Sequence, residues 1–80
     1  MTIDEKEELL VIFMEECAEA QVEASKIIRF GSSNAINNEV GDLLCMVELL
    51  KEYGLIDMGM VNKATKAKRE KLKKWSNLKL

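Results

Sequence analysis

The sequence predicts an all-α protein in which residues 1–80 form a single domain of three helices. Proline, which interrupts helices, is absent from the chain. Apolar residues recur three or four positions apart over long stretches, as they do on one face of a helix. Two breaks containing glycine, near residues 31 and 54, divide these stretches into three.

The first helix is expected from Ile3 to about Ile28, with its early acidic residues favoured by the helix dipole. Gly31 is expected to end it. The predicted apolar stripe consists of Leu10, Phe13, Cys17, Ala20, Ala24 and Ile27. The N-cap of the next helix is expected among Ser32, Ser33 and Asn34.

The second helix is expected over 35–53 and is apolar on nearly all sides, as buried helices are. Its apolar residues are Ile36, Val40, Leu43, Leu44, Met46, Val47, Leu49 and Leu50. Because two neighbouring helices in so short a chain cannot enclose it, we expect a homo-oligomer, with this helix at its centre.

The third helix is expected over 58–75, with Asp57 as its N-cap and a basic exposed face. Residues 1–57 carry a net charge of −9, and residues 58–80 carry +7. This distribution fits a cation site next to phosphate-binding side chains. The alternative is a non-catalytic helical module that binds nucleic acid through the third helix. Nucleic acid is not the expected partner, because no base-reading motif accompanies the basic residues.

The start of the chain is acidic and lacks the features of a signal peptide. No apolar run approaches the ~20 residues needed to span a bilayer. Cys17 and Cys45 lie in apolar stretches and are expected to be reduced, buried thiols. We therefore expect a cytoplasmic protein without a membrane partner.

Two pairs of carboxylates stand out, Glu16 with Glu19 and Glu39 with Asp42. Their three-residue spacing places the members of each pair on one helix face. Asp42 precedes the most apolar run of the chain, where a carboxylate is costly unless it is paired or binds a metal. Gly41, inside the same helix, is interpreted as a sign of close packing.

Convergence of both pairs would create a site with oxygen ligands only, which favours Mg²⁺, with Mn²⁺ as a substitute. The alternative is that these acids form surface salt bridges with basic residues. One pair alone would favour that alternative. Two pairs, one of them entering an apolar helix, favour the metal site.

The segment Glu15-Glu16-Cys17-Ala18-Glu19, followed by Glu39-Val40-Gly41-Asp42, resembles the EExxE…ExxD signature of the all-α nucleoside triphosphate pyrophosphohydrolases. These include MazG, the dimeric dUTPases and phosphoribosyl-ATP pyrophosphohydrolase. Residues 25–31 and 62–75 look like those of small MazG-like proteins, which bacteriophages often encode. The chain is shorter than most members and lacks a fourth full helix.

This resemblance implies Mg²⁺ binding by Glu16, Glu19, Glu39 and Asp42. It implies hydrolysis of a nucleoside or deoxynucleoside triphosphate between the α and β phosphates, giving the monophosphate and pyrophosphate. Such an enzyme controls a nucleotide pool, in the host cytoplasm if a phage encodes it. The resemblance also implies a dimer or a tetramer of paired subunits.

Roles for further residues follow from this chemistry. Glu15 or Glu19 is the candidate for orienting or deprotonating the attacking water. The candidates for binding the substrate phosphates are Lys26, Arg29, Asn62, Lys66 and Arg69. The alternative for these basic residues is a solvated surface that balances the acidic body. The sequence leaves open which base and sugar are preferred and how many metal ions bind.

Overall fold

The computed structural model describes residues 2–80, which form three helices and, within that range, no strand. Helix α1 spans Ile3–Phe30, α2 spans Ile36–Glu52 and α3 spans Met58–Trp75. The predicted all-α fold with three helices is confirmed, and the third helix has the expected bounds. None of the three combines the length and apolar character needed to cross a membrane.

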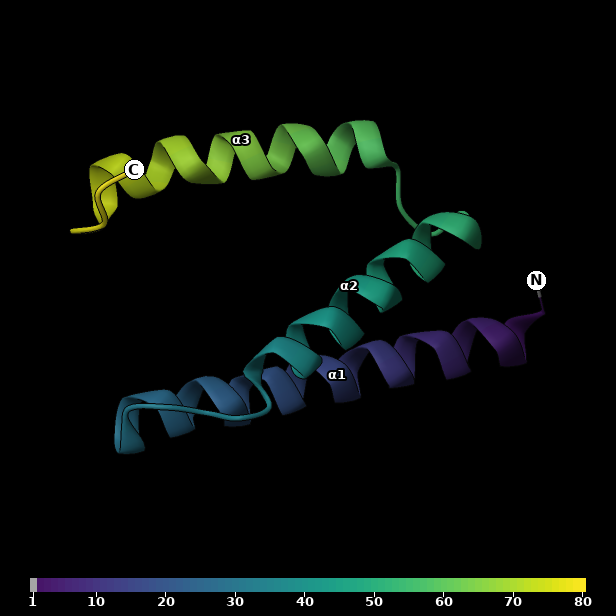
Figure 1. The fold of residues 1–80 in the computed structure, drawn as a ribbon. Helices are drawn as coiled ribbons and strands as arrows, with labels where there is room; N and C mark the ends of the chain where they lie inside the picture. The colour runs from purple at the N-terminus through teal and green to yellow at the C-terminus, as the bar shows by residue number, and fades with distance from the viewer. Residues whose placement is uncertain (1) are drawn as a thin grey trace.

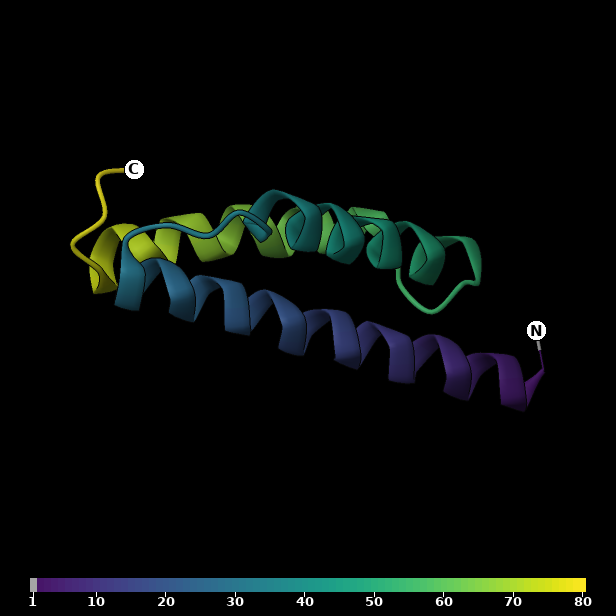
Figure 2. The same cartoon turned by 60° about the horizontal axis from the view of Figure 1, so that its bottom comes forward.

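Helices α1 and α2 run antiparallel and pack against each other, whereas α3 packs against neither of them to a comparable extent (Figures 1 and 2). The connection after α1 runs back beside the end of that helix before α2 begins (Figure 1). The arrangement is elongated, with principal extents of 42 × 29 × 15 Å. The α1–α2 pair therefore provides the interior that positions the site.

Local hydrogen bonds explain where the helices begin and end. The backbone N–H of Glu5 donates to the Thr2 hydroxyl at the start of α1. Gly31 ends α1 with a φ of 84°, a left-handed conformation that suits glycine, and its N–H donates to Ile27. Asp57 caps α3 as predicted, because its carboxylate accepts from the N–H of Met60 at 2.9 Å.

The prediction that one of Ser32, Ser33 and Asn34 is the N-cap of α2 is wrong. The N-cap is Ala35, which provides no side-chain hydrogen bond. The Ser33 hydroxyl donates to Glu23 of α1 and accepts from the N–H of Ala35. A serine that looked like a helix cap thus links the two helices.

The apolar core is small and consists of Leu9 from α1 with Met46 and Leu50 from α2. The stripe predicted for α1 is displaced, since Leu10 is 38% exposed while Leu9 is buried. The displaced face continues from Leu9 through Glu16 to Glu23, at steps of seven residues or two helical turns. A search for apolar residues cannot select a face that contains carboxylates.

Burial agrees with one further expectation and differs from two. In α2 only Met46 and Leu50 are buried, and Leu44 is 58% exposed, so a single chain does not enclose this helix. Both cysteines are free, but Cys17 is half-buried and Cys45 exposed, so the prediction of two buried thiols is wrong. The close packing inferred from Gly41 is also wrong within residues 2–80, because a Cβ there would meet open space.

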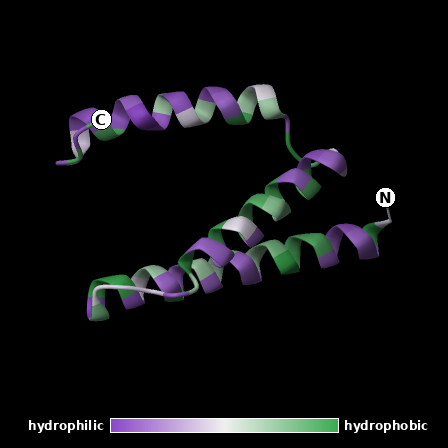
Figure 3. Ribbon diagram, in the orientation of Figure 1, coloured by the Kyte–Doolittle hydropathy of each residue, from purple (hydrophilic) through white to green (hydrophobic). Residues whose placement is uncertain are grey.

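Helix α3 differs from the other two because it contains no buried residue. Most of its ribbon has the colour of hydrophilic residues (Figure 3). Its last turn carries Lys73 and Lys74, which suit the negative end of the helix dipole. Helix α3 is therefore held to the rest of the described chain mainly through its connection to α2.

Candidate metal centre

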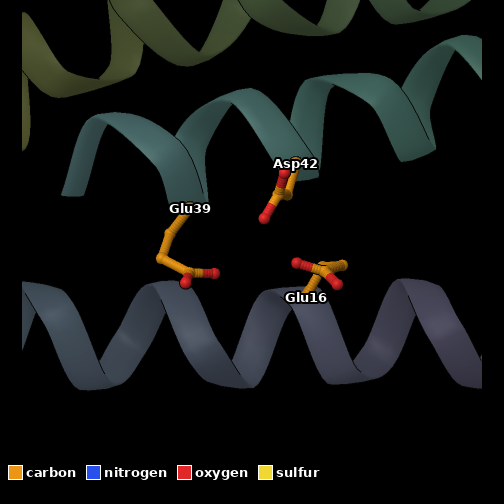
Figure 4. Close-up of side chains that lie close together, drawn as sticks. All are labelled: Glu16, Glu39 and Asp42. Atoms are coloured by element: carbon orange, nitrogen blue, oxygen red, sulfur yellow. The ribbon is translucent and has the colours of Figure 1, made fainter. Parts of the chain in front are cut away.

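Three carboxylates converge in the space between α1 and α2. Glu16 projects from α1, and Glu39 and Asp42 project toward it from α2 (Figure 4). One carboxylate oxygen from each residue lies within 4.8 Å of the other two. This distance is short enough for all three oxygens to contact one ion.

Local structure explains the convergence. Glu39 belongs to the first turn of α2, where the helix dipole favours a negative charge. Asp42 follows three residues later and therefore lies on the same face. Because α1 and α2 are antiparallel, this face meets Glu16, two helical turns after the core residue Leu9.

The burial of this cluster leaves two oxygen atoms without partners. Oε2 of Glu16 and Oε2 of Glu39 are buried, and neither has a hydrogen-bond donor among the described residues. A buried acceptor without a donor loses its interaction with water and gains nothing in return. Such atoms in a native interior call for a partner that residues 2–80 do not supply.

Electrostatic repulsion acts on the same two groups. Burial raises the pKa of Glu16 above its ordinary value, and the negative charges of Glu19 and Asp42 raise it further. Burial also raises the pKa of Glu39. The hydrogen-bonding contact with Glu19 and the negative charge of Glu19 raise it further. Both shifts mean that the cluster, by itself, disfavours its own ionised form.

The donor set fits a hard divalent cation. Its oxygens are carboxylates, no nitrogen or sulfur ligand is among them, and two lack donors. A cation would compensate both the missing hydrogen bonds and the repulsion. Glu19 is exposed and does not belong to the three carboxylates that lie within 4.8 Å of one another. It nevertheless raises the pKa of both Glu16 and Glu39.

None of the other predicted site residues belongs to the three carboxylates that converge within 4.8 Å. Glu15 is exposed on α1. Lys26 forms an ion pair with Glu23 at 3.0 Å. The Arg29 guanidinium lies 5.1 Å from the centroid of the Phe30 ring. The predicted phosphate-binding residues of α3, all exposed, are Asn62, Lys66 and Arg69.

Glu23 is the residue that the sequence reading missed. It is only 8% exposed, and its two oxygens accept from the Ser33 hydroxyl at 2.7 Å and pair with Lys26. The hydrogen bond from Ser33 is the main cause that lowers the pKa of Glu23, and the hydrogen bond from Lys26 lowers it further. Its position seven residues after Glu16, on the same helix face, was the signal available in the sequence.

Comparisons of this chain with protein-family models, with curated proteins and with solved structures gave no match. The inference of function therefore rests on the residues and their geometry, together with the motif resemblance described above.

Proposed function

We propose that this chain is a metal-dependent nucleoside triphosphate pyrophosphohydrolase of the MazG-like type. The observation that carries the proposal is the convergence of Glu16, Glu39 and Asp42, two of which, Glu16 and Glu39, each have a buried oxygen without a donor. These residues occupy the acidic positions of the EExxE…ExxD motif. The motif indicates the class of reaction. A bound cation would explain why these acidic side chains lie close together.

In this proposal Glu16, Glu39 and Asp42 hold Mg²⁺, and Glu19 completes the ligand set. The bound ion would offset the charge of the triphosphate and act as a Lewis acid. Glu15 or Glu19, both exposed beside the cluster, would accept the proton of the attacking water. The products would be the nucleoside monophosphate and pyrophosphate.

Phosphate binding falls to the basic side chains. Lys26 keeps nearly half of its side chain exposed while it pairs with Glu23, so it remains accessible to a phosphate oxygen. Arg29, one turn further along α1, offers a planar guanidinium suited to bidentate contact. The exposed residues Asn62, Lys66 and Arg69 of α3 are the remaining candidates.

The proposed active form is a homo-oligomer, a dimer or a tetramer. Three buried apolar residues make a very small core for 80 residues. Large apolar side chains are exposed on every helix, and burial of such side chains against another subunit would enlarge the core. The most exposed are Ile3, Met14, Ile28, Phe30, Leu44, Met60 and Trp75. Sedimentation equilibrium of the full chain, which gives the mass of the assembly, tests this part.

A second candidate function is nucleic-acid binding through α3, which the exposure and positive charge of that helix favour. It offers no reason for the unpartnered oxygens of Glu16 and Glu39. Binding of single- or double-stranded DNA that weakens steeply with salt and ignores Mg²⁺ would support it. Such binding in a chain that hydrolyses no triphosphate would replace the first proposal.

The decisive experiment incubates the full chain with a panel of ribo- and deoxyribonucleoside triphosphates, with Mg²⁺, Mn²⁺ or a chelator. We expect metal-dependent release of pyrophosphate and the monophosphate from at least one of them. Release of inorganic phosphate and the diphosphate would contradict the proposed bond cleavage. No release from any triphosphate at any metal concentration would remove the enzymatic proposal.

Two variants assign the activity to the cluster. Glu16→Gln and Asp42→Asn keep the side-chain size but remove a ligand charge, and each should lower turnover by about 100-fold or more. Glu48→Gln, on the exposed face of α2, is the matched control and should leave turnover unchanged. Wild-type turnover in either cluster variant, with unchanged helical circular dichroism, would disprove the assignment.

A further inference from the structure

We infer that Glu23 is a positioning residue that, through the Ser33 hydroxyl, holds the start of α2 and therefore Glu39 against α1. For its consequence at the metal centre, this inference rests on the proposed function. Glu23 lies outside the acidic motif, and none of the proposed catalytic steps uses it. It is nevertheless the one charged residue classed as buried within residues 2–80.

Both oxygens of the Glu23 carboxylate have partners, unlike those of the metal centre. Oε1 accepts from the Ser33 hydroxyl at 2.7 Å, and Oε2 lies 3.0 Å from Nζ of Lys26. A buried carboxylate satisfied at each oxygen has one favoured orientation, because any rotation breaks a charge-assisted bond. Glu23 is therefore a fixed point on α1, about 10 Å along the helix from Glu16.

The Ser33 hydroxyl links Glu23 to the start of α2. It donates to Glu23 and accepts from the N–H of Ala35 at 3.3 Å. Ala35 is the N-cap of α2 and contributes no side-chain hydrogen bond of its own. The hydroxyl thus joins α1 to the first backbone groups of α2, at the end of the helix where a shift matters most for the cluster.

Glu39 lies one helical turn beyond Ala35, and the backbone N–H of Glu39 donates to the Ala35 carbonyl at 3.0 Å. A displacement or fraying of Ala35 therefore moves Glu39 directly. Asp42 lies further along α2 and closer to Met46, which packs in the core with Leu9 of α1. Loss of the Ser33 hydroxyl should consequently loosen the Glu39 side of the centre while leaving the core half of α2 in place.

The first test measures amide hydrogen exchange in the full chain without metal. In Ser33→Ala, the hydrogen-bonded amides within residues 35–40, those of Ala35 and Glu39 among them, should exchange about fivefold faster than in wild type, as expected for the loss of one hydrogen bond. Those of residues 44–52 should be unchanged. Ser33→Thr keeps a hydroxyl and should restore slow exchange, and Ser32→Ala at the exposed neighbouring serine should have no effect.

The second test titrates Mn²⁺ into the same variants. Affinity should fall by roughly threefold to tenfold in Ser33→Ala and in Glu23→Ala, a typical size for coupling between sites. It should recover in Ser33→Thr. Glu7→Gln is the control for the loss of a negative charge. Glu7 is exposed and lies toward the start of α1, at a distance from Glu16 comparable to that between Glu16 and Glu23.

The outcomes separate the two proposals. Unchanged exchange at residues 35–40 in Ser33→Ala, or an equal increase in Ser32→Ala, would overturn the positioning role. Faster exchange with unaltered Mn²⁺ affinity would overturn its consequence at the centre. A wild-type chain that binds no Mn²⁺ would defeat the proposed function, and the exchange result would still decide whether Glu23 and Ser33 position α2.

Discussion

The interface between α1 and α2 has two halves of opposite chemical character. One half, near the start of α1, is closed by Leu9, Met46 and Leu50. The other half, toward the end of α1, is occupied by Glu16, Glu23 and Glu39, with Asp42 at its edge. The same two helices thus bury hydrocarbon at one end and carboxylates at the other.

The two halves differ in whether they require a proton or a bound cation. The apolar half is stabilised by removal of its side chains from water, and this requires neither a proton nor a bound ion. In the acidic half, Glu23 has partners for both oxygens, whereas Glu16 and Glu39 each keep one buried oxygen without a donor. Protonation or a bound cation would compensate these two residues.

The largest expected effect comes from the apolar half. Leu50→Ala removes a side chain that is 5% exposed and should lower the free energy of unfolding by about 3 kcal/mol. Urea denaturation, at one protein concentration throughout, measures this. Glu48→Ala on the exposed side of α2 is the control and should change it by less than about 0.5 kcal/mol. Equal losses in both variants would mean that Leu50 does not belong to a buried core.

The next effect belongs to the acidic half and depends on the ion. A metal concentration ten times the Kd should stabilise the wild type by about 1.4 kcal/mol. Glu16→Gln should melt at a higher temperature than wild type without metal, because repulsion is relieved, and should respond little to added Mg²⁺ or Mn²⁺. Thermal melting with and without a chelator measures both. A lower melting temperature for metal-free Glu16→Gln would contradict the idea that the ionised cluster is destabilising.

The three helices were largely predictable from the sequence, because periodicity and caps act locally. Asp57 caps α3 and Gly31 ends α1 as expected. The offset of the α1 stripe from Leu10 to Leu9 was not predictable, since it is set by where α2 packs. Gly41 was misread for a similar reason, because open space around a helical glycine depends on its neighbours in three dimensions.

For the acidic half, spacing predicted that Glu16, Glu39 and Asp42 gather, and the structure brings these three together. The same spacing also predicted Glu19 in this group, but the structure leaves Glu19 exposed and outside the three converging carboxylates, because the packing of α2 on α1 decides which part of the face is covered. The roles of Ser33 and Glu23 were missed because their bond joins a connection to a helix, and no local rule reports such a contact.

The pH dependence should separate the groups within the acidic half. Folding raises the pKa of Glu16 and Glu39 above 4.5, so the folded metal-free protein binds more protons and loses stability as pH rises through those values. Folding lowers the pKa of Glu23, so its contribution is present above 4.5 and lost as pH falls through its folded value. The melting temperature of the metal-free chain should therefore rise as pH falls from 7 toward 5.

The double variant Glu16→Gln/Glu39→Gln should flatten this rise, and Glu7→Gln should preserve it. Metal affinity should follow the opposite trend and weaken as pH falls, because protons compete for the same oxygens. A wild-type melting temperature that falls steadily between pH 7 and pH 5 without metal would show that these carboxylates do not repel one another in the folded chain.

The smallest effect compares two ion pairs with the same three-residue spacing. Lys26–Glu23 and Lys73–Glu70 have equally exposed lysines, but the side chain of Glu23 is 10% exposed and that of Glu70 is 69% exposed. Lys73→Met should alter the free energy of unfolding by no more than about 0.5 kcal/mol, as is typical of a solvated pair. Lys26→Met should cost more, because it leaves one oxygen of a largely buried carboxylate without its cation.

Urea denaturation at low and high salt measures both variants, and the loss in Lys26→Met should persist at high salt. Equal losses that both vanish in salt would place Glu23 with the surface acids and remove the basis for its positioning role.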